Sequence, residues 1–177
     1  MAQPDLTHYM TIVSVASHKC LDVANASNVN GAGIQLWECT GVDNQKWYVN
    51  RPGSVSLPIL SKHTQKVLDV TNAATDNGSK VQQWQWSGVP NQMWDIVPIL
   101  SRAGPQYYIR SSNGNNKCLD VAGNSHENGT DIQIWDCTGV ENQKWIFMVA
   151  PDPLPVGVAW KPEGSNSGTG APGANPH

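Results

Sequence analysis

The chain has 177 residues, which is enough for one compact domain with a sizeable core. Its formal net charge is −3 and only 14% of its residues are charged, so it lacks the basic field that attracts nucleic acid. The longest apolar runs span only a few residues, which excludes insertion into a membrane.

The N-terminal part of the chain predicts a strand without a preceding leader. MAQPDLTHYM has no basic segment followed by an apolar core, so we expect no secretory signal. Residues 9–15 (YMTIVSV) alternate as a strand does. The 16 Gly and 12 Pro, and the lack of sustained apolar spacing of three and four, favour many short strands over helices.

One motif then recurs three times. It reads CLDVANASNVNGAGIQLWECTGVDNQKW from Cys20 to Trp47, and related copies run from Val67 to Trp94 and from Cys118 to Trp145. Every copy keeps Leu-Asp-Val, a central Asn-Gly, Gln-x-Trp, Gly-Val and Asn-Gln-x-Trp. We therefore expect the protein to carry three equivalent functional sites, one in each copy.

Further strand-like segments lie between the copies, at residues 46–49, 55–61, 94–100 and 107–112. Each unit therefore holds about four short strands, which gives about twelve in all. Three units are too few for the usual β-propeller. A closed barrel with threefold pseudosymmetry leaves no sheet edge exposed and suits three copies better.

The four cysteines occupy equivalent positions of the first and third copies only. The middle copy has Val67 and Trp86 there, so both cysteines are missing together. This pattern favours a disulfide within each outer copy, and the alternative is buried free thiols in a reducing compartment. We expect no metal site, because no C-x-x-C or Cys/His cluster occurs. The candidate disulfide residues are Cys20 with Cys39, and Cys118 with Cys137.

If the two cysteines of a copy face each other across a hairpin, Asp22 lies opposite Trp37 and the turn is centred beside Asn30-Gly31. A bulge in the long loop would shift this register by a residue. The same pairing places Asp69 opposite Trp84, and Asp120 opposite Trp135. In the middle copy it would place Val67 against Trp86, an apolar contact in place of the bridge.

Alternation along the strands assigns the side chains to two faces. One face would fill the barrel with Leu21, Val23, Ile34 and Leu36. The other would carry Cys20, Asp22, Gln35, Trp37 and Cys39. A Trp on the outward face beside a carboxylate and a carboxamide indicates a binding platform. The second Trp of each copy (Trp47, Trp94, Trp145) is flanked by apolar residues and is predicted to lie in the core.

The triplicated Leu-Asp-Val, Gln-x-Trp and Asn-Gln-x-Trp pattern resembles the ricin B-chain type β-trefoil lectins, also classed as a carbohydrate-binding module family, over about residues 6–149. The resemblance implies an all-β fold, a six-stranded barrel capped by three hairpins, with one shallow sugar site per repeat. The expected lectin domain is 1–149, with repeats of about 6–50, 51–103 and 104–149. A Pro/Gly-rich tail, 150–177, follows; we expect it to be partly extended or disordered, and hypothesise that Trp160 anchors it as a packing arm.

By the same resemblance, Asp22 takes two neighbouring sugar hydroxyls, Trp37 stacks on the apolar sugar face, and Asn44 bonds a ring hydroxyl. Gln35 and Gln45 match residues that contact the sugar or brace the carboxylate. The second set is Asp69, Gln82, Trp84, Asn91 and Gln92, and the third set is Asp120, Gln133, Trp135, Asn142 and Gln143. The middle copy also differs from the other two at Gln83, where they have Leu36 and Ile134, and at Pro90 before Asn91. We therefore expect a functional but weaker site there.

These residues imply a lectin without enzymatic activity or cofactor, whose partners are galactose- or N-acetylgalactosamine-terminated glycans on glycoproteins or glycolipids. Multivalent binding would make it an agglutinin. A xylan-type targeting module of a hydrolase, a trefoil protease inhibitor, and aspartates that only brace hairpins remain as alternatives, and a homodimer is left open. No acidic pair or nucleophile motif favours an enzyme. The missing signal suggests a cytoplasmic location or non-classical export, whereas the cysteine pairs suit an extracellular setting.

Overall fold

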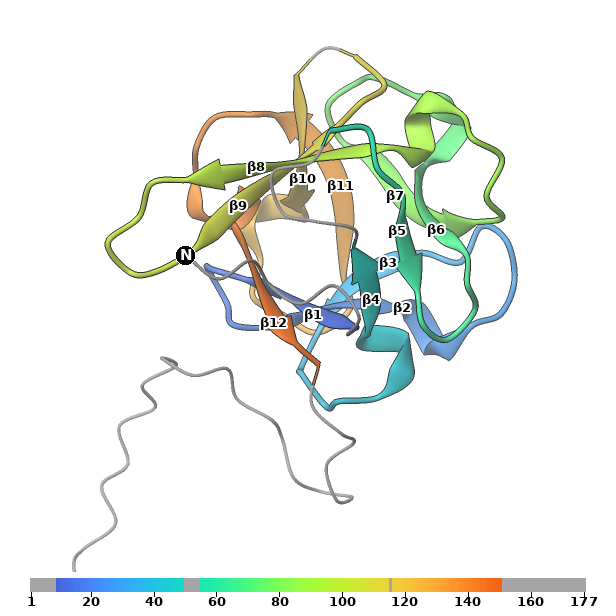
Figure 1. The fold of residues 1–177 in the computed structure, drawn as a ribbon, viewed down its shortest axis with the longest axis horizontal. Coiled ribbons are helices and arrows are strands. Elements are labelled where there is room, and N and C mark those ends of the chain that lie inside the picture. Colours follow the sequence, from blue (N-terminus) through green and yellow to red (C-terminus); the bar gives the residue numbers. More distant parts are fainter. Residues whose placement is uncertain (1–8, 50–54, 115, 151–177) are drawn as a thin grey trace, which may run out of the picture.

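The computed structural model describes residues 9–49, 55–114 and 116–150, and these fold into twelve strands and six short 3-10 turns (Figure 1). Six strands form a barrel: β1 (Met10–Ser14), β4 (Trp47–Val49), β5 (Ile59–Ser61), β8 (Trp94–Ile99), β9 (Gln106–Ser111) and β12 (Trp145–Val149). The other six form three hairpins: β2 (Cys20–Val23) with β3 (Ile34–Trp37), β6 (Val67–Val70) with β7 (Ser79–Trp84), and β10 (Lys117–Val121) with β11 (Thr130–Asp136). The fold is a β-trefoil, as predicted.

The barrel closes through antiparallel pairing around the whole ring. β12 pairs with β1, β1 with β4, and β4 with β5. An isolated bridge between Leu57 and Trp94 links the segment before β5 to β8. The ring then continues from β8 to β9 and from β9 back to β12. The predicted strand at 55–61 is thus shorter than expected, since only its last part forms a regular ladder.

The three hairpins also pair with one another and cap the barrel. β11 pairs with both β3 and β7, and a bridge from Gly33 to Gln82 joins the first hairpin to the second. Each repeat therefore contacts both of the others. The residues that are adjacent around this cap come from different copies of the motif.

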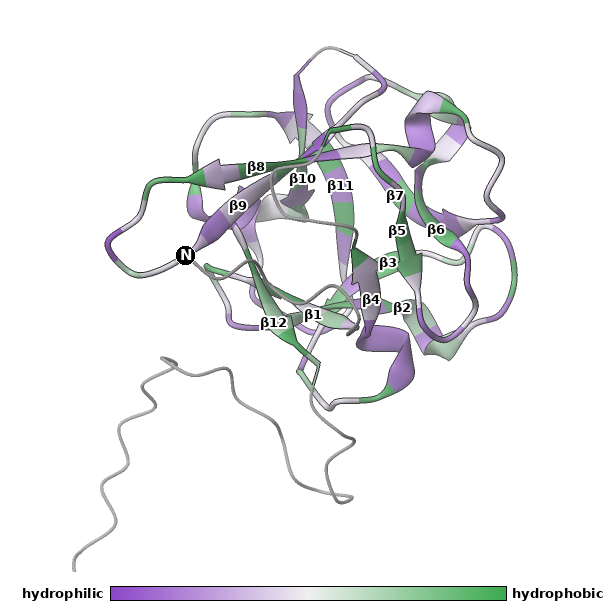
Figure 2. Ribbon diagram, viewed as in Figure 1, coloured by the Kyte–Doolittle hydropathy of each residue, from purple (hydrophilic) through white to green (hydrophobic). Residues whose placement is uncertain are grey.

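The core consists of the inward-facing residues of all three repeats. Leu21, Val23, Ile34 and Leu36 are buried there, which confirms the face assignment. Figure 2 shows this alternation as green and purple bands along β11, whereas β5 is mostly green. The second Trp of each copy is completely buried, as predicted, and donates its indole N–H to the backbone carbonyl of a hairpin leucine. These bonds join Trp47 to Leu21, Trp94 to Leu68 and Trp145 to Leu119.

The predicted hairpin register was wrong by two positions, although the faces were right. Asp22 lies opposite Gln35, and Trp37 lies opposite Cys20. The middle and third hairpins have the same register, so that Asp69 faces Gln82 and Asp120 faces Gln133. The prediction failed because the first disulfide runs diagonally, from Cys20 within the ladder to Cys39 beyond its end. A shift of two keeps the alternation, so every side chain stays on its predicted face.

The three Asn-Gly pairs lie in turns, as predicted, but these are not tight two-residue hairpin turns. Each hairpin leaves its first strand through a 3-10 turn: η1 (Ala24–Ala26), η3 (Thr71–Ala73) or η5 (Ala122–Asn124). Gly31 has a positive φ of 88°, but Asn30 does not have a positive φ, so the pair does not form the turn expected of two such residues. The Asn-Gly pairs also contact a neighbouring repeat, as described below.

Both predicted disulfides form, Cys20–Cys39 and Cys118–Cys137, each with Cα atoms 5.1 Å apart. In the middle repeat Val67 lies opposite Trp84 rather than Trp86, so the predicted Val67–Trp86 pairing is not found in the ladder. No helix among the described residues is long and apolar enough to cross a membrane. The predicted packing arm and Trp160 lie outside the described residues.

Candidate carbohydrate-binding sites

Each repeat gathers its five predicted site residues from three elements. The aspartate lies on the first hairpin strand, and the first Gln and the exposed Trp lie on the second. The Asn and second Gln lie on a 3-10 turn just before the next barrel strand, namely η2 (Asp43–Gln45), η4 (Pro90–Gln92) or η6 (Glu141–Gln143). The fold thus brings all five together in every repeat.

Three side-chain amides hold the carboxylate in the first repeat. Gln35 Nε2 donates to Asp22 Oδ1 at 2.9 Å, while Asn44 Nδ2 and Gln45 Nε2 both donate to Oδ2 at 3.0 Å. The corresponding bonds in the second and third repeats are 2.8 to 3.1 Å long. The buried aspartate is therefore a fixed acceptor at the floor of each site.

The second Gln of each site is a brace. Gln45 is buried, and its Nε2 also donates to the Glu38 carbonyl while its Oε1 accepts from the Thr40 backbone N–H. These bonds tie the carboxylate to the segment that follows Trp37. Gln92 and Gln143 make the same bonds in their repeats. Of the two roles that the resemblance allowed for Gln45, its burial and bonds match the brace.

Burial raises the pKa values of Asp22 and Asp120. Desolvation raises the pKa of Asp22 above its ordinary value, and the hydrogen bonds from Gln35, Gln45 and Asn44 offset only part of this. The pKa of Asp120 is raised for the same reason and is likewise opposed by its three amides. A carboxylate that is costly to desolvate gains from any further donor that a ligand supplies.

A half-exposed indole stands beside each carboxylate. Trp37 is 39% exposed, and Trp84 and Trp135 are each 41% exposed, which confirms the prediction that the first Trp of each copy faces outward. The site of the third repeat is a pocket of about 240 Å³ and that of the second about 250 Å³. Both are shallow and open to solvent.

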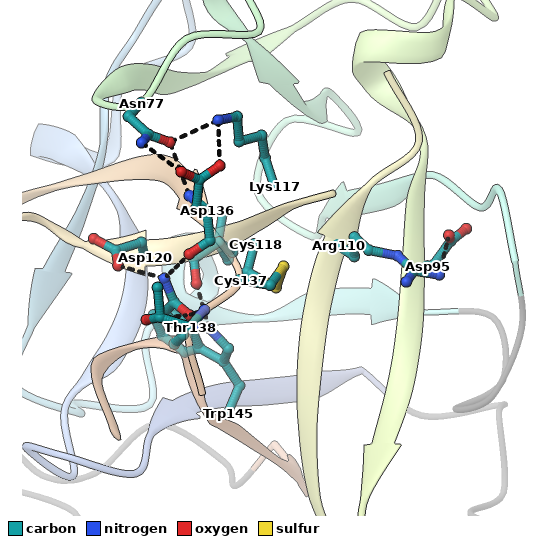
Figure 3. Close-up of a disulfide and its surroundings, with 12 residues drawn as sticks. Asn77, Asp95, Arg110, Lys117, Cys118, Asp120, Asp136, Cys137, Thr138 and Trp145 are labelled. Atoms are coloured by element: carbon teal, nitrogen blue, oxygen red, sulfur yellow. Dashed lines mark hydrogen bonds and ion pairs between the residues drawn. A yellow bond between two sulfur atoms is a disulfide. The ribbon is translucent and has the colours of Figure 1, made fainter. Parts of the chain in front are cut away.

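The pockets also include residues to which the sequence had assigned no role. Val140 and Thr138 line the third site, and Val89 and Ser87 line the second. The sequence could have indicated the valine, because Gly-Val recurs in all three copies of the motif. Figure 3 shows Thr138 close to Asp120 and to the Cys118–Cys137 disulfide in the third repeat.

The Asn-Gly pair of each repeat supports the site of the next. The side-chain oxygen of Asn128 accepts from the backbone N–H of Glu38, the residue after Trp37. A Cβ on Gly129 would lie 3.8 Å from Cζ3 of Trp37. In the same way Asn30-Gly31 lies against Trp84, and Asn77-Gly78 against Trp135. The sites are therefore linked head to tail around the threefold axis.

One of these links is strengthened by a charge. Asn77 Nδ2 also donates to Asp136, and Lys117 Nζ lies 2.6 Å from the same carboxylate (Figure 3). The two donors from Lys117 and Asn77 lower the pKa of Asp136. The segment that follows Trp135 is thus fixed by both a hydrogen bond and an ion pair.

The middle repeat keeps the site geometry despite its departures. Pro90 occupies the first position of its 3-10 turn, where no backbone donor is needed. Gln83 is fully buried, but it accepts from Thr64 and donates to the carbonyls of Ser27 and Val29. These bonds satisfy the buried amide and attach the loop of the first repeat to the second.

Comparisons with known proteins agree with this architecture. The family described as ricin-type beta-trefoil lectin domain matches residues 8–145. Serine protease 1 of Rarobacter faecitabidus is 34% identical over 128 residues, which make up 72% of this chain and 22% of the protease. The designed threefold-symmetric protein ThreeFoil is 34% identical, with a TM-score of 0.73, over 78% of this chain and 96% of its own.

A second solved structure is similar over only part of its length. An exo-beta-1,3-galactanase of Clostridium thermocellum is 31% identical, with a TM-score of 0.74, over 82% of this chain and 31% of the galactanase. The chain therefore spans about a fifth of the protease and a third of the galactanase. The similarity concerns one domain of each enzyme.

Proposed function

Because the chain belongs to the ricin-type β-trefoil lectin family, we propose that it binds glycans ending in galactose or N-acetylgalactosamine, with one site in each repeat. The observation that carries this proposal is the threefold recurrence of an exposed indole beside an aspartate held by three amides. A structural brace alone would not require an exposed Trp beside it. The aspartate, the exposed Trp, the first Gln and the Asn of each repeat are the proposed contacts, and the second Gln braces the aspartate from behind.

The hydrogen-bonding capacity of the first site suits a sugar hydroxyl. An ionised carboxylate offers about four lone-pair sites, and three amides use three of them on Asp22. Both N–H groups of Asn44 are engaged, so its Oδ1 is the group that would accept from a ring hydroxyl. Gln35 has a second N–H with which to donate. A sugar hydroxyl both donates and accepts, and matches this arrangement.

The indole supplies the apolar half of the recognition. Its face packs against C–H groups with little loss of rotamer entropy. A pyranose with an axial hydroxyl next to an equatorial one, as in galactose, leaves one face apolar enough to stack. That sugar would place its neighbouring hydroxyls at the carboxylate while its apolar face covers Trp37.

A glycan array followed by calorimetric titration tests the proposal. We expect binding to galactose-type termini and three sites per chain. Replacing Trp37, Trp84 or Trp135 with Ala should weaken its own site by about tenfold or more, because buried apolar area is lost. The matched control is Tyr48→Ala on β4, which removes an exposed aromatic outside the three sites and should leave all of them unchanged. An array without binding to any sugar class would refute the proposal.

Three sites on one rigid body would also bridge glycans on different cells. Avidity can then exceed the affinity of one site by orders of magnitude without any new contact. We expect the protein to agglutinate glycan-bearing cells, and a variant that keeps only one exposed platform Trp to bind without agglutinating.

A second candidate function is the targeting of a larger enzyme to a polysaccharide. The similarity to single domains of a protease and a galactanase favours this reading. Pull-down with insoluble xylan and β-1,3-galactan separates the two functions, because a targeting module would bind internal chain segments as well as chain ends. Inhibition of a protease without sugar binding would instead indicate a trefoil inhibitor.

A further inference from the structure

The middle repeat exposes one indole more than its counterparts. Trp86 occupies the position of Cys39 and Cys137, which form disulfides in the other repeats. It is 43% exposed, two residues beyond the platform Trp84. All residues from 84 to 90 are exposed, and none of them carries a charge.

The site of the middle repeat fixes the backbone on both sides of Trp86. Gln92 Nε2 donates to the carbonyl of Gln85 at 2.9 Å, and Gln92 Oε1 accepts from the N–H of Ser87 at 2.8 Å. The same Nε2 donates to Asp69 at 3.0 Å. One buried side chain therefore sets the position of Trp86 relative to the carboxylate of the second site.

Trp86 does not itself line that pocket, but its ring lies next to the segment that does. A Cβ on Gly88 would be 3.9 Å from Cζ2 of the indole, and Gly88 lies between the pocket-lining residues Ser87 and Val89. In the third repeat, the equivalent Gly139 is instead approached by the hydroxyl of Tyr108 at 3.4 Å. An indole beside this glycine thus distinguishes the middle repeat from the third.

We propose that Trp86 is a second stacking platform, which contacts the sugar unit next to the one held at Trp84 and makes the middle site selective for oligosaccharides. The inference rests on the proposed function. An uncharged surface of two indoles with carboxamide and hydroxyl groups suits a neutral pyranose chain. It lacks the charged side chains that would indicate an ionic partner.

The experiment isolates the middle site. In a Trp37→Ala/Trp135→Ala background, the chain is titrated with galactose, lactose and β-1,3-galactobiose. We expect lactose or β-1,3-galactobiose to bind more tightly than galactose. Trp86→Ala should remove that advantage, a loss of about 3- to 10-fold for one aromatic contact, and leave galactose binding unchanged. Tyr48→Ala is the matched control and should change neither sugar's affinity.

A second variant serves if Trp86→Ala does not fold. The register of β6 and β7 equals that of β2 and β3, so Val67→Cys/Trp86→Cys is expected to form the disulfide of the other repeats. It should keep galactose binding and lose the disaccharide advantage. Unchanged disaccharide preference in both variants, or no preference in the parent, would overturn the role of Trp86 while leaving the proposed function intact. No sugar binding by the parent would overturn both.

Discussion

The aspartate of each site is buried and held by three side-chain amides. Asp22 is only 4% exposed, yet it accepts three amide hydrogen bonds and has its pKa raised by desolvation. Among the described residues no Lys or Arg pairs with Asp22, so the amides hold its charge. In the proposed site the ionised carboxylate would accept a donor from the ligand, so binding would need the ionised form.

Acidification should abolish binding at the first and third sites before an ordinary aspartate would protonate. The pKa values of Asp22 and Asp120 are raised, so both carboxyls lose their acceptor form as the pH falls through an elevated pKa. Acidification changes the stability of the fold in the opposite direction to binding, since it raises the free energy of unfolding. The ionised groups destabilise the fold above the folded pKa, and this cost disappears as the pH falls through it.

Titration of the first site in a Trp84→Ala/Trp135→Ala variant, from about pH 7 to pH 4, measures this loss, with circular dichroism as a control for unfolding. Affinity that stays constant down to the ordinary pKa of aspartate would contradict the assignment.

At the scale of the element, each outer hairpin is fastened by a disulfide that begins beside its platform. Cys20 lies opposite Trp37, and its bond to Cys39 closes the strand end that carries the indole. We expect Cys20→Ala/Cys39→Ala to lower the free energy of unfolding by about 2–4 kcal/mol. Sugar affinity at the first site should fall, because Trp37 loses its support.

The middle hairpin supplies the internal control, since it holds Trp84 without a disulfide. Thermal unfolding and single-site titration of the variant measure both effects. Weakened binding at the middle site, or unchanged stability, would contradict this role for the bridge.

The hairpins also show what the sequence could predict. The faces were predictable because alternation depends only on spacing, so the core position of Leu21 and the exposure of Trp37 followed from parity. The register was not, because it was inferred from a disulfide that lies partly outside the ladder. The contact of Gly129 with Trp37 had no local signal, because the two belong to different copies.

At the scale of the molecule, the three sites form a ring in which each repeat depends on a neighbour. The third repeat supports the first site, the first supports the second, and the second supports the third, each through an Asn-Gly pair. One repeat alone would lack the other barrel strands, and it would also lack the Asn-Gly pair that contacts its exposed Trp. If the proposed sites bind sugar, the triplication matters for binding as well as for the fold.

This arrangement predicts that a substitution in one repeat changes the site of another. Asn128→Ala removes the acceptor for the Glu38 N–H beside Trp37. The loss of one hydrogen bond of about 1 kcal/mol should weaken the first site by about fivefold, while the third site, in the same repeat as Asn128, keeps its affinity. Asn30→Ala should act on the second site in the same manner. Calorimetry in the corresponding single-site backgrounds measures each effect, and a variant that weakened only the site of its own repeat would show that the ring of contacts does not support binding.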